Sequence, residues 1–208
     1  TCVEAGVHIV TGDTKVVEKG ALDKFVINTS GIGMRSEVLD RNIAEVRKYR
    51  EFASRWLLDS NLRGGDEIIV SGTVGDHGLA ILSFREGYGF ETEITSDVAP
   101  LNKLTRRLLG VGGIVKMKDP TRGGLSNTLS EWSEKSGVGI LVHEDQIPVR
   151  EGVRAACEML GIDPLEVGNE GKVVVAVVPQ KAEEVLDELR RTREGMDAKL
   201  IGEATKEF

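Results

Sequence analysis

Short apolar segments that end in a glycine-rich, charged turn recur along this chain and limit how it can fold. Glycine supplies 25 of the 208 residues, or about 12% against roughly 7% in an average protein. These glycines follow no collagen-like period, so they serve turns, close backbone contacts or anion-binding loops. Helices and strands joined by such turns favour an α/β or α+β fold, in which helices cover a sheet.

The spacing of apolar residues predicts strands and helices in irregular alternation. Strands are expected over residues 7–12, 15–17, 24–30, 66–73, 113–117, 138–142, 172–178 and 198–201. Helices are expected over residues 37–58, 78–86, 101–109, 124–136, 149–160 and 181–191. A cluster of turn-forming residues at 61–66 predicts the boundary between two parts of the chain.

The predicted helix over residues 37–58 is amphipathic, because apolar side chains recur on one side and charged side chains on the other. One interpretation is a helix that packs on the core of the protein. The other is a helix that binds a partner protein, with Trp56 and Leu57 in the contact. The sequence leaves both interpretations open.

Charge and cysteine content exclude several classes of protein. The net charge is −7. Residues 1–65 carry 10 basic and 9 acidic side chains, which leaves 17 and 25 in residues 66–208 and a local net charge of −8. Such an acidic body does not bind duplex nucleic acid electrostatically. No apolar run approaches the roughly 20 residues that span a membrane. The two cysteines, Cys2 and Cys157, form no CxxC motif, which indicates a reduced, cytosolic protein.

Four glycine-containing turns carry the residues from which an anion site is built: 12–15 (GDTK), 72–78 (GTVGDHG), 119–124 (DPTRGG) and 168–172 (GNEGK). Glycine lets backbone N–H groups approach phosphate oxygens, and a helix N-terminus adds its positive dipole end. None of the four matches a P-loop or a dinucleotide-binding fingerprint. Any one of them could be a charged surface turn, but four in one chain favour a polyphosphate site.

Individual side chains in these turns have both a chemical and a structural interpretation. Asp13 and Lys15, two residues apart, could bind a metal–phosphate unit or form a surface ion pair. Arg122 precedes a predicted helix that opens with two glycines, which favours phosphate binding. Glu170 stands at the entrance of an apolar strand and could be a general base, a Mg²⁺ ligand or a surface group.

Four other polar side chains have a simpler structural interpretation. Asp76 can cap the helix that follows it, although His77 beside it could act as a base or phosphate donor. His8 lies in an apolar segment and is expected in the core. Cys157 lies on the apolar face of a predicted helix and is expected to be unreactive.

In this order the motifs resemble the HypE family of hydrogenase expression/formation proteins, within the aminoimidazole ribonucleotide synthetase (PurM-like) superfamily. The resemblance rests on residues 12–20, 70–82, 96–101, 118–125, 136–140, 147–179 and 201–205. It implies two parts. Residues 1–62 would be the end of an ATP-binding, dimer-forming N-terminal half, and residues 63–208 a complete α+β C-terminal half with a mixed sheet.

The resemblance also implies a reaction. Family members receive a carbamoyl group on a C-terminal cysteine thiol and dehydrate it, with ATP and Mg²⁺, to a thiocyanate. The cyanide then becomes an iron ligand during [NiFe]-hydrogenase assembly. Implied partners are a carbamoyltransferase, an iron–cyanide scaffold complex and a second copy of the chain, all in the cytoplasm.

Residue roles are implied by position within the matching motifs. Lys15 and Glu170 would be catalytic, and Asp13 would bind the metal ion. The cofactor-binding residues would be Gly12, Asp13, Thr14, Asp119, Arg122, Gly123, Gly124 and Asn169.

Three departures from the family pattern qualify the implied function. The opening strands of the family are missing, and the chain ends in Lys206-Glu207-Phe208 without the C-terminal cysteine. Residues 34–62 also form a longer segment than the short link usual in the family. We therefore expect a fragment that is inactive alone. One alternative is another ATP-dependent synthetase or kinase of the superfamily. A second is a non-catalytic module that docks a partner through the helix at 37–58.

Overall fold

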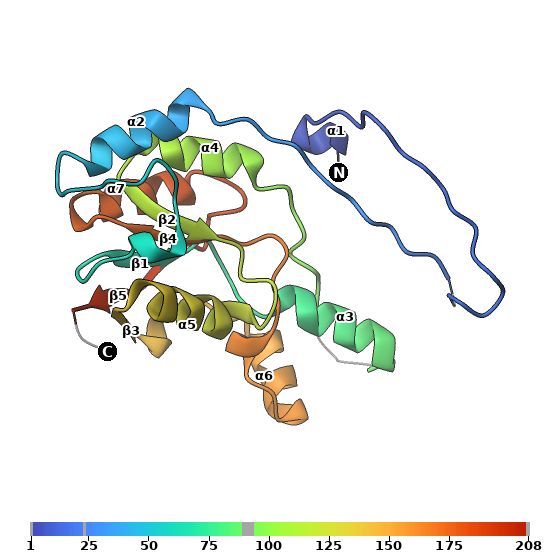
Figure 1. Ribbon diagram of the computed structural model, residues 1–208. Coiled ribbons are helices and arrows are strands. Elements are labelled where there is room, and N and C mark those ends of the chain that lie inside the picture. Colours follow the sequence, from blue (N-terminus) through green and yellow to red (C-terminus); the bar gives the residue numbers. More distant parts are fainter. Residues whose placement is uncertain (1, 23, 89–93, 207–208) are drawn as a thin grey trace.

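A five-stranded antiparallel sheet forms the centre of the molecule in the computed structural model, which describes residues 2–22, 24–88 and 94–206 (Figure 1). The strand order is β2-β4-β1-β5-β3. The strands are β1 (Glu67–Val70), β2 (Ile114–Lys118), β3 (Gly139–Val142), β4 (Val174–Val177) and β5 (Lys199–Thr205). The expected α+β fold is confirmed, and every pairing is antiparallel where the resemblance implied a mixed sheet.

Helices cover both faces of this sheet. Helices α4 (Asn102–Val111) and α7 (Pro179–Arg190) bury their apolar residues against one face. Helix α5 (Gly124–Ser136) packs on the other face, where Trp132 is fully buried. Helix α2 (Glu37–Val46) packs against α4 and β2. Helices α3 (Asp76–Glu86) and α6 (Glu151–Leu160) pack together at one end of the molecule.

The remaining elements are short. Helix α1 comprises Cys2–Ala5, and single 3₁₀ turns occupy η1 (Asp59–Asn61), η2 (Glu144–Gln146) and η3 (Pro164–Glu166). None of the helices in the described part of the chain has the length and apolar character needed to cross a membrane.

The strands and helices predicted from residue 66 onward are confirmed, with ends shifted. Most of them bury apolar residues in one of three clusters, one on each face of the sheet and one between α3 and α6, and this burial is what the apolar spacing reports. Helix α6 shows the agreement at its end. Gly161 caps it with a φ of +67°, a conformation that glycine adopts without steric cost.

The helix predicted over residues 37–58 is wrong in its second half, since α2 ends at Val46. The chain then folds back without regular structure. Phe52 is buried in this turn, and its carbonyl accepts a hydrogen bond from Nε of Arg47 at 2.9 Å. Trp56 is 52% exposed, with the Arg35 guanidinium 4.9 Å from its ring centroid. Helical spacing of apolar residues therefore does not require a helix, since here the chain turns back and buries Phe52 while Trp56 is exposed.

The strands predicted over residues 7–12, 15–17 and 24–30 are also wrong for this structure. The N-terminal arm, defined here as residues 7–35, has no strand among its described residues and projects away from the body (Figure 1). Ile9, Val10 and Phe25 are exposed, and His8 lies in solvent instead of the core. A strand needs a hydrogen-bonded neighbour, and no pairing of the described sheet includes the arm.

Asn42 fixes α2 to the sheet. Its buried side chain donates a hydrogen bond from Nδ2 to the Ile114 carbonyl at 2.7 Å. Its Oδ1 accepts one from the Ile114 N–H at 2.8 Å. This bond pair satisfies the backbone of β2, a strand at the sheet edge, on its outer side. Helix α2 thus packs on the same body as residues 63–208, and the predicted division of the chain at residues 62 and 63 stays a prediction.

We expect Asn42→Ala to lower the free energy of unfolding by about 2–4 kcal/mol, because it leaves a buried N–H and a buried carbonyl of Ile114 without partners. Urea denaturation measures this change. Arg41→Ala, on the exposed side of the same helix, is the control and should change stability by less than about 0.5 kcal/mol. Equal effects of the two substitutions would contradict this role of Asn42.

Candidate functional site

Three of the four glycine-containing turns meet at one end of strands β1, β2 and β4. Strand β4 lies antiparallel between β1 and β2, so its first residue, Val174, pairs with the last residues of both neighbours, Val70 and Lys118. The turn after β1, the turn after β2 and the turn before β4 therefore come together. We call this group the loop cluster and define it as residues 72–78, 96–99, 119–124 and 167–172.

Direct hydrogen bonds hold the loop cluster together. The Gly78 N–H donates to the Gly168 carbonyl at 3.0 Å. The Asn169 N–H donates to the Pro120 carbonyl at 3.0 Å. These two bonds join the 167–172 turn to each of the other two turns.

The side chain of Asn169 lies at the centre of the loop cluster and is fully buried. Its Oδ1 accepts a hydrogen bond from the Gly75 N–H at 2.8 Å. Its Nδ2 donates to the carbonyls of Pro120 and Val167 at 3.3 and 3.0 Å. The amide thus binds all three turns. Its predicted role in cofactor binding stays a prediction, and the structure adds a role in holding the loops.

Two glycines of the loop cluster permit close backbone contacts. A Cβ on Gly124, whose φ is +64°, would lie 2.3 Å from the Leu165 carbonyl oxygen. A Cβ on Gly171 would lie 1.7 Å from the carbonyl oxygen of Asp97. Both distances are far below van der Waals contact, so a side chain at either position would separate the loops.

The DPTRGG turn presents a basic group beside a helix N-terminus. Asp119 and Arg122 are exposed, and Gly123 precedes α5 with a φ of +69°. Helix α5 is 13 residues long, so its N-terminus carries a partial positive charge. Positive charge therefore gathers at this end of the loop cluster, and the cofactor-binding roles predicted for Asp119, Arg122, Gly123 and Gly124 stay predictions.

The GTVGDHG turn is largely internal. Asp76 is the first residue of α3 and is 1% exposed. Its carboxylate accepts a hydrogen bond from the Thr73 hydroxyl and lies 3.4 Å from Nε of Arg150. Nδ1 of His77 lies 2.8 Å from the Ser96 hydroxyl. The predicted capping role of Asp76 is wrong, because Gly75 occupies the N-cap position and no side chain caps α3. Asp76 instead ties this turn to Thr73 and Arg150.

Glu170 is exposed at the surface of the loop cluster, whereas its main chain is held from beneath. Its N–H donates a hydrogen bond to Oδ1 of Asp97 at 3.2 Å. Oδ2 of Asp97 lies 3.5 Å from Nζ of the buried Lys172. Asp97 is not among the site residues predicted from the sequence. The one sequence feature that pointed to it was its place in stretch 96–101, which matches the family.

The fourth turn does not join the others. Gly12, Asp13, Thr14 and Lys15 lie on the exposed N-terminal arm, away from the loop cluster (Figure 1). The Asp13 carboxylate accepts a hydrogen bond from the Thr14 N–H at 2.8 Å. Within the described residues, no group of three His, Cys, Asp or Glu side chains could hold a metal ion. The roles predicted for these four residues therefore stay predictions.

Cys157 lies on the buried face of α6, as the sequence predicted, and is 1% exposed. Burial raises the pKa of its thiol, with a smaller contribution from the charge of Asp163. A thiol that stays protonated is a poor nucleophile. Cys157 is thus a core residue.

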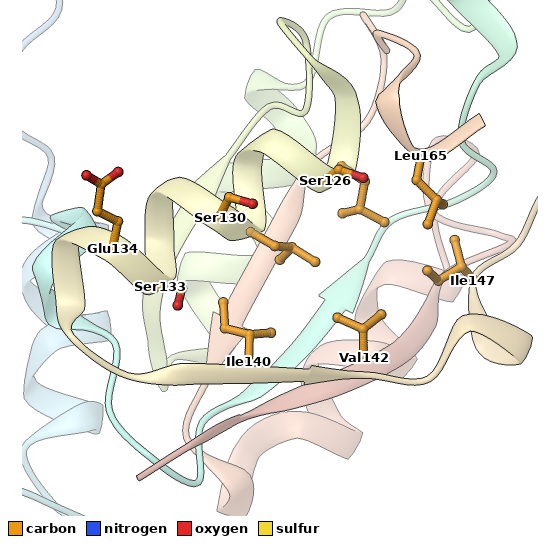
Figure 2. Close-up of a pocket in the computed structure, with 10 residues that line it drawn as sticks. Ser126, Ser130, Ser133, Glu134, Ile140, Val142, Ile147 and Leu165 are labelled. Carbon is orange, nitrogen blue, oxygen red and sulfur yellow. The ribbon is translucent and has the colours of Figure 1, made fainter. Parts of the chain in front are cut away.

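An open apolar groove of about 530 Å³ lies between α5 and β3 (Figure 2). In this view Ile140 and Val142 point from β3 toward α5, while Ile147 and Leu165 lie at one end. Glu134 is the single charged side chain in its lining, and none of the predicted site residues contributes to it. Without Lys or Arg, this groove is not suited to phosphate groups.

The sequence profile of AIR synthase related proteins, C-terminal domain, matches residues 63–208. The chain belongs to this family. A protein of Methanocaldococcus jannaschii is 50% identical over all 208 residues, which make up 57% of its length. The carbamoyl dehydratase HypE of Bradyrhizobium diazoefficiens is 47% identical over 203 residues, 97% of this chain and 54% of that protein. The chain thus spans about half the length of these relatives, and the sequence resemblance to HypE proteins is confirmed.

Solved HypE structures share the fold of this chain. One matches with a TM-score of 0.80 and 38% identity over 98% of this chain and 59% of its own. HypE in complex with ATP matches with a TM-score of 0.69 and 44% identity over 71% of this chain and 44% of its own. HypE in a HypE–HypF complex matches with a TM-score of 0.70 and 48% identity, over 71% and 49%.

We expect Asn169→Ala to loosen the loop cluster, because it removes three hydrogen bonds and leaves the Gly75 N–H without a partner. The free energy of unfolding should fall by about 2–4 kcal/mol, and the Gly75 amide should exchange faster with solvent. Urea denaturation and amide hydrogen exchange measure the two effects. Asn127→Ala, which removes bonds of a partly exposed side chain on α5, is the control and should leave Gly75 protected.

Proposed function

We propose that this protein acts in [NiFe]-hydrogenase maturation as an ATP-dependent carbamoyl dehydratase. Its substrate would be a carbamoyl group on a C-terminal cysteine thiol, and its product the thiocyanate. One observation of the structure supports this proposal most: the exposed carboxylate of Glu170 projects from a tightly held loop cluster that also carries Arg122 and the start of α5. Similarity to a protein named carbamoyl dehydratase HypE supplies the reaction class.

The reaction requires an acid–base group and an anion site. The oxygen of a carboxamide is a poor leaving group until it is phosphorylated. Transfer of the γ-phosphoryl group from ATP to that oxygen, with loss of one N–H proton, gives an imidoyl phosphate and ADP. Loss of phosphate together with the second N–H proton then leaves the C≡N bond. A carboxylate that reaches the nitrogen can accept these protons, which is the role we assign to Glu170. Arg122 would offset the negative charge of the departing phosphate.

The described residues fit part of an ATP site. Arg122, Gly123 and the N-terminus of α5 provide positive charge and accessible backbone for phosphate oxygens. Asp119 is exposed on the same turn and would belong to the same site. We propose that Gly12, Asp13, Thr14 and Lys15 complete the site when the N-terminal arm pairs with further strands, as the resemblance implies. Lys15 would then lie near the carboxamide.

The described residues do not by themselves fit a Mg²⁺ site. Asp13 is a single carboxylate on the arm, whereas Mg²⁺ prefers six oxygen ligands, several of them water. The proposed role of Asp13 therefore depends on groups other than those of the loop cluster. We route no step of the reaction through the metal ion.

We also propose protein partners. A HypE structure that resembles this chain was solved in a complex with HypF, which supports contact with a hydrogenase-maturation partner. A carbamoyltransferase and an iron–cyanide scaffold complex are the partners that the chemistry requires. A homodimer in the cytoplasm completes the proposal. Docking through a helix at 37–58 is not proposed, because α2 ends at Val46 and Trp56 lies outside it.

We expect Glu170→Gln to lower kcat for dehydration by about 10²–10⁴-fold, because the amide cannot accept a proton. The assay follows thiocyanate formation on a peptide with a C-terminal S-carbamoyl cysteine, in the presence of ATP. It uses residues 1–208 joined to the flanking segments of the Bradyrhizobium diazoefficiens relative, which this chain covers to 54%. Glu166→Gln, an exposed carboxylate in η3, is the matched control and should keep full activity. Full activity of Glu170→Gln would refute the proposed role.

We expect Arg122→Gln to weaken ATP binding about 10- to 100-fold, which corresponds to the loss of one charged hydrogen bond. Calorimetric titration of the same extended protein with ATP measures the affinity. Arg106→Gln, exposed on α4 over the other face of the sheet, is the control and should bind ATP normally. Unchanged affinity of Arg122→Gln would place the phosphates elsewhere.

A further inference from the structure

Asp97 is a buried carboxylate directly beneath Glu170. Its side chain is 2% exposed. Oδ1 accepts the hydrogen bond from the Glu170 N–H, at 3.2 Å. The carboxylate itself is enclosed, so it does not meet a substrate. It contacts the main chain of the residue to which we assign proton transfer.

Lys172 accounts for the charge of this carboxylate. Its Nζ lies 3.5 Å from Oδ2 of Asp97, and its side chain is 10% exposed. The stem of Lys172 packs against Gly72, where a Cβ would lie 3.1 Å from Cε. Taking one charge out of such a pair leaves the other buried and uncompensated, which is strongly unfavourable. The pair therefore fixes Asp97 relative to the turn after β1.

The backbone of the two segments is also in close contact. The carbonyl oxygen of Asp97 lies where a Cβ on Gly171 would be, at 1.7 Å from that ideal position. The turn around Glu170 is thus held at three consecutive residues. These are the N–H of Glu170, the backbone at Gly171 and the ammonium group of Lys172. Three consecutive residues of one turn contact a single aspartate or pair with it.

We infer that Asp97 is a positioning residue for Glu170. It holds the Glu170 main chain in one place, so that the exposed carboxylate meets the carbamoyl nitrogen in the same geometry at each turnover. A displacement of about 1 Å can cost on the order of 10²-fold in rate. This inference rests on the proposed function, because it assigns Asp97 to the proton transfer of Glu170.

Asp66 provides a matched control. It is 1% exposed, its Oδ2 accepts a hydrogen bond from the Arg63 N–H at 2.8 Å, and its Oδ1 lies 2.6 Å from Nη1 of Arg50. Like Asp97, it is a buried carboxylate with a backbone N–H on one oxygen and a cation at the other, although Arg50 hydrogen-bonds to Asp66 whereas Lys172 lies 3.5 Å from Asp97 without a hydrogen bond. Asp66 precedes β1 and thus lies at the opposite end of that strand from the loop cluster.

The first test needs no activity and uses the 208-residue chain. Amide hydrogen exchange, followed by NMR, reports the bond from Glu170 to Asp97. Asp97→Ala should speed exchange of the Glu170 amide at least tenfold, whereas Asp97→Asn, which keeps an acceptor oxygen, should retain most of the protection. Asp66→Ala should expose the Arg63 amide and leave Glu170 protected. Equal Glu170 exchange in all variants would overturn the inference.

The second test measures dehydration in the extended protein described above. Asp97→Ala should lower kcat about 10- to 100-fold with the KM for ATP within twofold, Asp97→Asn should recover most of kcat, and Asp66→Ala should keep it. The double variant Asp97→Ala with Lys172→Met removes both charges and should fold even if Asp97→Ala does not, again with low kcat. If Glu170→Gln is inactive while Asp97→Ala keeps full activity, the inference about Asp97 is overturned and the proposed function stands. Active Glu170→Gln would overturn the proposed function and this inference with it.

Discussion

Because β4 lies antiparallel between β2 and β1, the beginning of β4 lies next to the last residues of both neighbouring strands. The turns that leave β1 and β2 and the turn that enters β4 must then share the same space. They can do so only if backbone approaches backbone without side chains between, as at Gly124 and Gly171. Sheet topology and glycine placement are thus two parts of one constraint, and the loop cluster is its result.

Close packing of loops creates buried polar groups, which are costly unless each finds a partner. Here most of the partners are side chains of the turns themselves, whereas Oδ1 of Asp76 and Oδ2 of Asp97 make no hydrogen bond and are offset by the charges of Arg150 and Lys172. The Asn169 amide hydrogen-bonds to backbone groups of all three turns. Asp97 accepts a hydrogen bond from the Glu170 N–H and forms an ion pair with Lys172. A network that is satisfied in this way is rigid. Rigidity is what a carboxylate such as Glu170 needs if it is to act on a reacting atom at a defined position.

The two ends of the candidate site differ in how completely the described residues build it. Around Glu170 the supporting side chains, Asp97 and Asn169, are in place and buried. Around Asp13 and Lys15 the chain is extended and exposed, and its apolar side chains face solvent. The apolar groove between α5 and β3 is a separate surface with a single acidic lining residue and no basic one (Figure 2). The groove thus lacks the basic side chains that would offset phosphate charge, and our proposal keeps phosphate binding at the loop cluster.

Local patterns were enough to predict much of this molecule. Continuous apolar runs found β1 and β4, and helical spacing found α5 and α7, because these elements bury their apolar residues on one or the other face of the sheet. Glycine beside charged residues found three turns that do meet, and it selected Glu170 and Arg122 within them. Resemblance to a known family supplied the reaction, which no spacing of residues could indicate.

Other features depended on neighbours that are distant in the sequence. After Val46 the predicted helix is replaced by irregular chain in which Phe52 is buried while Trp56 and Leu58 are exposed. The described residues of the arm have strand-like spacing but pair with no strand. Asp97 gained its importance only when folding brought it to Glu170, 73 residues away. The sequence by itself determined which segments are regular and which turns carry chemistry, because both depend on adjacent residues. Tertiary structure alone decided which of those turns share a site, because that depends on which strands pair and on which buried polar groups find partners.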